Sequence, residues 1–225
     1  MIQTSDTHNT IVKLDPINTA LYQFSIKELA HIHLSGCKRP IEGGTIFSLL
    51  NIVLREIRHA KGYDKSKNFI PVVGAFAVIE QIGTAYEAIH IEKSSATNPI
   101  KKAIHYFSDT VSSSEDIDIL HALRNSLVHE ASLVRTQKNP IHFFRYNWDL
   151  ELAVKAPTYS WNGNFNTFNP AHNFTEINPN LVIELAFEIV ANAIKYLDIG
   201  MLEIKLEKHE LLHRYLGFEP TKSNQ

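Results

Sequence analysis

The chain contains very little cysteine. Of its 225 residues only Cys37 is a cysteine, and tryptophan and methionine occur twice each. A single thiol excludes an internal disulfide framework and any metal site built from several cysteines, which agrees with a reducing compartment. We therefore interpret Cys37 as an ordinary thiol.

Long hydrophobic runs are also missing. The longest, at residues 70–79, is far shorter than the roughly 20 apolar residues of a bilayer-spanning helix. Residues 1–6 lack the basic region followed by an apolar one that marks a secretory signal. We expect a cytoplasmic protein without a membrane partner.

Positive charge is not in excess. Lys and Arg number 22 against 24 Asp and Glu, so the formal net charge is −2. This balance argues against a protein that coats nucleic acid without specificity, because such binding depends on clustered Lys and Arg, but it permits a local basic patch. The length and the 44% hydrophobic content predict one well-buried domain over residues 1–225.

Apolar residues at helical spacing predict a mainly helical fold. Start and stop signals place helices at residues 16–34, 45–62, 69–92, 98–107 and 179–215, the last with a break near Gly200. The segment 69–92 is apolar on nearly all sides, which is typical of a central, buried helix. Glu80 and Glu87 interrupt it, and a buried carboxylate needs a partner.

The pattern changes after Glu130. Short segments rich in β-branched or aromatic residues, at 132–136, 141–147 and 150–155, predict a small β-hairpin or meander. Residues 157–180 then form a long loop rich in aromatic residues and asparagine, and such loops inside compact domains are often functional. We predict that residues 132–178 are an insertion of a β-hairpin and loop into the helical fold.

A further helix is predicted to begin at residues 113–116 and to end near Glu130. On it a polar stripe faces one side and an apolar stripe faces the other. The polar stripe holds Asp118, His121, Asn125, His129 and Ser132; the apolar one holds Leu120, Leu123, Leu127 and Ala131. Arg124 falls on the apolar side, which favours an ion pair with Glu80 or Glu87.

The six residues from Arg124 to His129 read Arg-Asn-Ser-Leu-Val-His and resemble the R-N-x-x-x-H signature of HEPN domains. This resemblance implies an all-α HEPN-like bundle bearing the motif on a late helix. It also implies a metal-independent endoribonuclease of the toxin or defence type, without a cofactor. In that family two protomers pair their motifs in a shared cleft, so a homodimer and an antitoxin or other regulatory protein are the implied partners.

The residue types of the motif suit RNA cleavage by the 2′-hydroxyl. His129 can move protons near neutral pH, and the guanidinium of Arg124 can stabilise charge on phosphoryl oxygens. Asn125, one turn from His129, can orient the ring or the phosphate. On an ideal helix Arg124 and His129 diverge by about 140°, which predicts a distorted helix end or a second protomer at the site.

Two other groups of residues are candidates. Arg135, Lys138 and Arg145, interleaved with aromatic residues, suit contact with RNA, although ordinary hairpin packing explains them too. The segment His209-Glu210-Leu211-Leu212-His213 matches the H-E-x-x-H pattern of zinc hydrolases. Its third ligand would have to be Glu219, so zinc chemistry is the remote alternative and we predict no metal site.

The second alternative is a HEPN-fold module that binds a nucleotide or a protein without catalysis. In that case Arg124 pairs with a carboxylate in the core and His129 is a surface residue. The placement of Arg124 and His129 discriminates between the two functions. The RNA target and the identity of a partner do not follow from the sequence.

Overall fold

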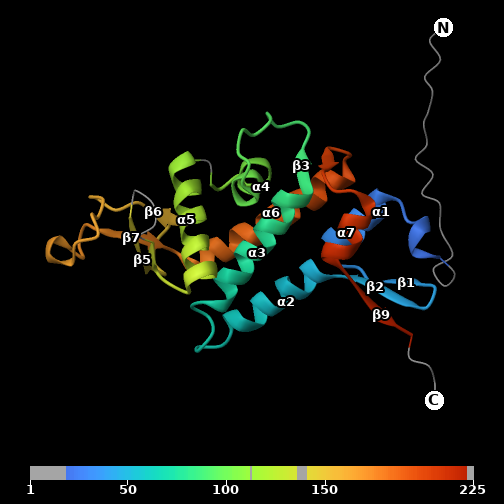
Figure 1. The fold of residues 1–225 in the computed structure, drawn as a ribbon, viewed down its shortest axis with the longest axis horizontal. Coiled ribbons are helices and arrows are strands. Elements are labelled where there is room, and N and C mark those ends of the chain that lie inside the picture. The colour runs from blue at the N-terminus through green and yellow to red at the C-terminus, as the bar shows by residue number, and fades with distance from the viewer. Residues whose placement is uncertain (1–18, 112, 136–140, 222–225) are drawn as a thin grey trace, which may run out of the picture.

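Helix α3 (Ile70–Ala85) lies at the centre of the molecule, as the apolar segment 69–92 predicts (Figure 1). The computed structural model describes residues 19–111, 113–135 and 141–221. Three helices pack around α3, namely α2 (Leu49–Lys61), α4 (Pro99–Phe107) and α6 (Pro179–Asp198). Burial of α3 from several sides agrees with its lack of a polar face. No helix of the described part combines the length and the apolarity needed to cross a bilayer.

The expected mainly helical bundle is wrong, because the fold mixes helices with three β-sheets. Helices hold about 50% of the described residues and strands 17%. The first sheet is antiparallel and contains β1 (Arg39–Ile41), β2 (Gly44–Ser48) and β9 (Leu216–Pro220). The second pairs β3 (Tyr86–Ala88) with β8 (Leu202–Ile204), and the third holds β4 (Val134–Arg135), β5 (His142–Tyr146), β7 (Phe174–Ile177) and β6 (Val154–Lys155).

Several predicted helices are shorter than expected because their ends are strands. Residues 45–48, expected at the start of a helix, lie in β2, and the central helix stops at Ala85, where the chain continues as β3. The long C-terminal helix breaks after α6, where Gly200 has a φ of +73°, and resumes as α7 (Lys208–Tyr215). These strands pair with partners far away in the sequence, and helical spacing contains no information about such pairing.

At the N-terminal side the predicted helix 16–34 is also shorter. Residues 16–18 lie outside the described part, residues 21–23 form one 3-10 turn, and α1 (Ile26–Ser35) begins after Ser25. The Ser25 hydroxyl accepts the backbone N–H of Glu28, and the Glu28 carboxylate accepts that of Ser25. This reciprocal cap starts the helix where the sequence Ser-x-x-Glu stands.

The expected β-hairpin at residues 132–178 is instead a mixed four-stranded sheet. Strands β4 and β5 are antiparallel, but β5 and β7 are parallel, with Phe143 opposite Phe174. Strand β7 lies in the segment that we expected to be a loop. A parallel pair needs a long crossover, and residues 147–173 form it here.

Aromatic side chains hold this crossover against the sheet. The ring of Phe143 lies 5.6 Å from that of Trp161 and 5.1 Å from that of Phe168, measured between centroids. Asparagine amides close its turns, as where Asn173 donates to the carbonyl of Tyr159 over 2.9 Å. The aromatic and asparagine content of residues 157–180 therefore has a structural role.

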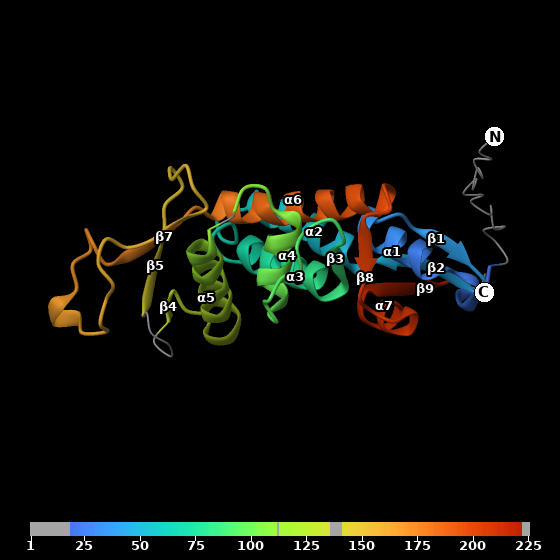
Figure 2. The same ribbon diagram turned by 90° about the horizontal axis from the view of Figure 1, so that it is seen from above.

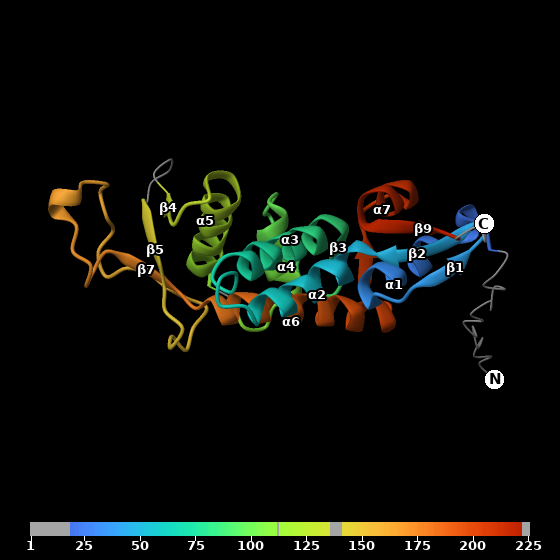
Figure 3. The ribbon, with the colours of Figure 1, turned by 90° about the horizontal axis from the view of Figure 1, so that it is seen from below.

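Figures 2 and 3 show how the parts follow one another along the long axis. The first sheet, with α1 and α7, lies at one end, the helices around α3 lie in the middle, and α5 (Ser114–Glu130) with the four-stranded sheet lies at the other end. One continuous hydrophobic core connects them, from Leu29 in α1 to Phe144 in β5. Helix α6 runs along one long side of the molecule.

Gly83 allows α3 and α4 to approach closely. A Cβ atom at this position would lie 1.8 Å from the carbonyl oxygen of Pro99 and 2.9 Å from the backbone nitrogen of Ala103. Backbone atoms in a packed helix cannot move aside easily. Any side chain at position 83 would therefore push α4 away from α3.

We expect Gly83→Ala to lower the free energy of unfolding by about 1–3 kcal/mol, because overpacking outweighs the gain in helix propensity. Urea unfolding measures this change. Gly74→Ala in the same helix is the matched control, since its Cβ would meet the Ile57 side chain at 2.8 Å and a side chain can shift. A Gly83→Ala protein as stable as the control would show that the helices tolerate separation.

His33 is a fully buried histidine in the core. Its side chain is fully covered, its Nδ1 lies 2.8 Å from the Tyr86 hydroxyl, and its ring stacks on Tyr215 with centroids 5.2 Å apart. Burial lowers the pKa of His33 to about 4, while the hydrogen bond with Gln81 opposes this shift weakly. The folded protein therefore binds a proton at His33 less readily than the unfolded chain does.

This difference predicts that acid destabilises the fold between about pH 6.5 and pH 4. In this window the unfolded chain holds the extra proton, so stability is complete above it and falls by about 3 kcal/mol as the pH decreases through it. The pH dependence of urea unfolding measures the effect. His33→Gln should flatten the curve, whereas His31→Gln, at an exposed position of the same helix, should leave it unchanged. Equal slopes in both variants would contradict the assignment.

Candidate functional site

Helix α5 carries the R-N-x-x-x-H motif and has the predicted boundaries. Ser113 caps its first turn by accepting the backbone N–H of Asp116, and Glu115 and Asp116 lie there, where acidic side chains favour the positive helix end. At the other end Ala131 adopts a φ of +48°, and its N–H donates to the carbonyl of Ser126. The motif thus occupies the last two turns of a capped helix.

One chain brings the Arg124 guanidinium and the His129 imidazole together. Arg124 Nη1 lies 2.8 Å from His129 Nε2 and also donates to Asn125 Oδ1 over 3.1 Å. The predicted divergence of these two residues around the helix holds for their Cα directions only. The long arginine side chain bends toward the C-terminal turn, so neither a distorted helix end nor a second protomer is needed for their contact.

Glu80 of α3 holds the other side of the guanidinium. Arg124 Nη2 lies 2.5 Å from Glu80 Oε2, so the predicted ion pair with a carboxylate of the central helix is confirmed for Glu80. Glu87 instead pairs with Lys102 at 2.5 Å and with Lys205 at 3.6 Å. The Glu80 side chain is 38% exposed and that of Arg124 16%, so the pair lies near the surface.

The hydrogen bonds also determine which ring nitrogens accept. Arginine only donates, so His129 Nε2 accepts and the ring proton of this arrangement lies on Nδ1. Asn98 Oδ1 accepts two backbone N–H groups at the start of α4, which leaves its amide nitrogen to donate to His121 Nε2 at 3.1 Å. The Asn125 amide donates to the same atom, also at 3.1 Å. A chain of contacts thus connects His129 to His121 through Arg124 and Asn125.

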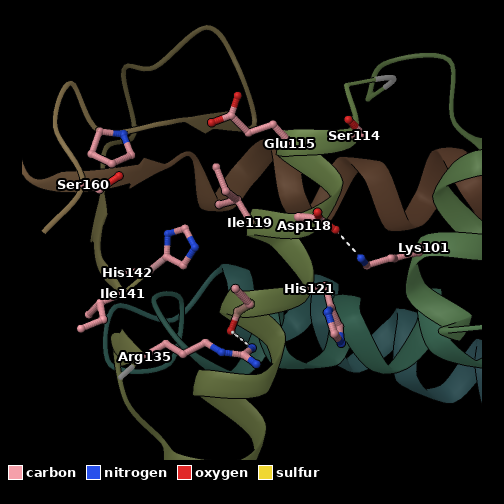
Figure 4. Close-up of a pocket in the computed structure, with 12 residues that line it drawn as sticks. Lys101, Ser114, Glu115, Asp118, Ile119, His121, Arg135, Ile141, His142 and Ser160 are labelled. Carbon is pink, nitrogen blue, oxygen red and sulfur yellow. Dashed lines mark hydrogen bonds and ion pairs between the residues drawn. The ribbon is translucent and has the colours of Figure 1, made fainter. Parts of the chain in front are cut away.

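A hollow of about 300 Å³ opens beside the motif. Its lining includes Asn125, Ser126, His129, Glu130 and Arg135. His129 is exposed and Asn125 half-buried, so a ligand in the hollow reaches both side chains. A larger cavity shares Arg135 with this hollow and lies between α5 and the four-stranded sheet (Figure 4).

Two of the three residues predicted to bind RNA, Arg135 and Arg145, lie in different surroundings. Arg135 is buried, and its Nη1 donates to the carbonyl of Ala122 over 3.2 Å. Arg145 is exposed, forms an ion pair with Glu176 and lies over the Phe174 ring. Lys138 lies outside the described residues. Arg135 is therefore the one of these arginines that lines the hollow at the motif.

The H-E-x-x-H segment forms the short helix α7. The rings of His209 and His213 lie 6.3 Å apart, and the Glu210 carboxylate accepts the backbone N–H of Glu207. Glu219, the expected third ligand, pairs with Lys38 at 3.4 Å. In the described part of the chain no three His, Cys, Asp or Glu side chains are grouped as metal ligands. Glu210 thus caps its own helix, and among the described residues no third metal ligand accompanies the two histidines.

Two residues of this region were not singled out from the sequence. His142 projects from β5 into the larger cavity, and Asn98 of the α4 cap reaches His121. Both depend on contacts between separate elements, so spacing along the chain contains no signal for them.

Comparisons of the chain with protein-family models, with curated proteins and with solved structures gave no match. The resemblance to HEPN domains accordingly depends on the six residues from Arg124 to His129.

Proposed function

We propose that the protein is a metal-independent endoribonuclease of HEPN type. The observation that carries the proposal is the 2.8 Å contact between Arg124 Nη1 and His129 Nε2 at the accessible end of α5. A cation and a proton acceptor beside each other are the two groups that cleavage by the 2′-hydroxyl requires. The hollow next to them provides room for the phosphate.

In the proposed reaction the RNA phosphate attracts the Arg124 guanidinium, which frees the lone pair on His129 Nε2. This nitrogen takes the proton of the 2′-hydroxyl while the 2′ oxygen forms a bond to phosphorus. The bond from phosphorus to the 5′ oxygen breaks, and that oxygen takes a proton from water. The products are a 2′,3′-cyclic phosphate and a 5′-hydroxyl, and His129 returns its proton to solvent.

Glu80 and Asn125 act as positioning residues in this proposal. Glu80 holds Nη2 of the guanidinium, so Nη1 remains directed at His129. The remaining nitrogen, Nε, is buried and has no hydrogen-bond partner among the described residues. An unsatisfied buried donor costs about 1–3 kcal/mol, which argues that this arrangement serves more than stability.

We expect His129→Ala to lower the rate of RNA cleavage by about 10²–10⁴-fold, the usual contribution of a general base. Single-stranded RNA with EDTA present is the substrate, and end analysis should find 2′,3′-cyclic phosphates. His209→Ala is the control and should cleave as fast as the parent. A His129→Ala protein with the parental rate ends the assignment, as does cleavage of an RNA that lacks the 2′-hydroxyl.

The homodimer is part of the proposal, on the strength of the family resemblance, and so is an antitoxin or other regulatory protein. Because the pair forms within one chain, each protomer of a dimer should contain a complete site. Arg124→Gln should lower the rate by about 10²–10³-fold, as the loss of charge stabilisation does elsewhere.

Mixing the Arg124→Gln and His129→Ala proteins should therefore restore no activity. Sedimentation of the mixture reports the oligomeric state in the same sample. Recovery of cleavage on mixing would mean that the two groups come from different protomers.

The second candidate is a HEPN-fold module that binds a nucleotide or a protein without cleavage. The Glu80 ion pair favours it, because the charge of Arg124 is already balanced in the absence of a ligand. This function predicts a parent protein that leaves RNA intact with and without EDTA.

A further inference from the structure

The larger cavity has the dimensions of a small-molecule site. Its volume is about 560 Å³, within the range of roughly 300–1,000 Å³ that ligand pockets occupy. Its wall includes one face of α5 and the start of the four-stranded sheet (Figure 4). Side chains of both kinds line it, with Ile119 and Ile141 as apolar residues and Arg135 and His142 as polar ones.

Arg135 is a buried cation that has no counter-ion among the described residues. Arg135 is 9% exposed, and its Nη1 donates a hydrogen bond to the carbonyl of Ala122. None of the ion pairs between described residues includes it. A buried charge is costly unless an opposite charge accompanies it. The guanidinium presents a planar fork of donors, which matches a phosphate group. An anion in the cavity would satisfy Arg135.

His142 adds a second polar contact next to Arg135. It is 8% exposed, its Nδ1 lies 3.2 Å from the Thr175 hydroxyl, and its ring stacks on Phe144. No hydrogen bond to a described residue engages its Nε2. Burial and, second, the charge of Arg135 lower the pKa of His142, which leaves a neutral ring that can stack or hydrogen-bond.

Acidic groups limit the charge that the cavity accepts. Asp118 forms an ion pair with Lys101 and is thereby balanced, but Glu115 is exposed at the rim. Among the described residues the cavity therefore has one guanidinium and one carboxylate outside any ion pair, and this small charge favours a ligand with a single phosphate over one with several. The Glu115 carboxylate and the Ser160 hydroxyl at the rim can form hydrogen bonds with the hydroxyls of a ribose.

The cavity is connected to the motif through residues that contact both. Arg135 lines both the cavity and the hollow that contains His129. His121 lines the cavity and accepts a hydrogen bond from Asn125 of the motif. A ligand phosphate on Arg135 therefore lies beside the proposed reaction site.

We propose that this cavity binds a nucleoside monophosphate unit, with the phosphate on Arg135 and the base against His142. The unit is either the nucleotide that follows the cleaved bond in RNA or a free nucleotide. The RNA source rests on the proposed ribonuclease function, whereas the free nucleotide does not.

The test is a binding titration of the full-length His129→Ala protein, which does not consume RNA. The probes are 5′-AMP, a single-stranded RNA hexamer and inorganic phosphate. Calorimetry gives the dissociation constant, and the imidazole resonance of His142 in NMR spectra reports occupancy of the cavity. We expect 5′-AMP or the hexamer to bind more tightly than phosphate and to shift the His142 resonance.

Three variants locate the site. Arg135→Gln should weaken binding by about tenfold or more, the effect of losing a charged hydrogen bond. Ser160→Trp places a bulky ring at an exposed position of the rim and should weaken binding similarly without touching the core. Lys155→Gln, at an exposed position of β6 in the same sheet but outside the cavity lining, should change the constant by less than about twofold.

The outcomes separate the two proposals. If 5′-AMP binds to the His129→Ala protein and the parent protein never cleaves RNA, the cavity proposal is supported and the ribonuclease proposal is refuted. Binding of the hexamer alone, with a shifted His142, supports the RNA source. The cavity proposal is overturned if neither 5′-AMP nor the hexamer binds at millimolar concentration, or if phosphate binds as tightly as 5′-AMP. Both results count even where the parent cleaves RNA. Binding unchanged by Ser160→Trp overturns it as well.

Discussion

The ion pair between Arg124 and Glu80 is the constraint on which the site depends. It joins the motif helix α5 to the central helix α3. It also leaves Nη1 of the guanidinium directed at His129. Without Glu80, a flexible arginine has no reason to stay beside the imidazole, because holding its side chain still costs conformational entropy. The same contact therefore has a structural and a chemical effect.

The position of α3 in turn depends on close packing in the middle of the molecule. Gly83 lets the start of α4 lie against α3, and Asn98 at that start reaches His121 on α5. A small residue in the core thereby determines where an amide meets the motif helix. His33 shows the opposite case, since a polar ring is kept in the core by the hydroxyl of Tyr86 and the ring of Tyr215.

The four-stranded sheet adds what a helical bundle would lack. It places Arg135 and His142, which are opposite each other in β4 and β5, across from α5 and encloses the cavity between them. Its outer face is covered by the aromatic crossover, so the asparagines and aromatic residues of that segment serve the sheet. Arg145, which resembles a nucleic-acid contact in the sequence, is already paired with Glu176.

Periodicity and capping in the sequence were sufficient to predict the central helix, the motif helix with its cap at Ser113, and an ion pair between Arg124 and a carboxylate of α3. These features are local, or follow from the cost of burying a charge. The tertiary structure alone decided that three short sheets interrupt the helices, that Glu80 and not Glu87 is the partner, and that Arg124 reaches His129 within one chain. Strand pairing and side-chain reach depend on residues distant in the sequence, and no spacing along a single chain specifies them.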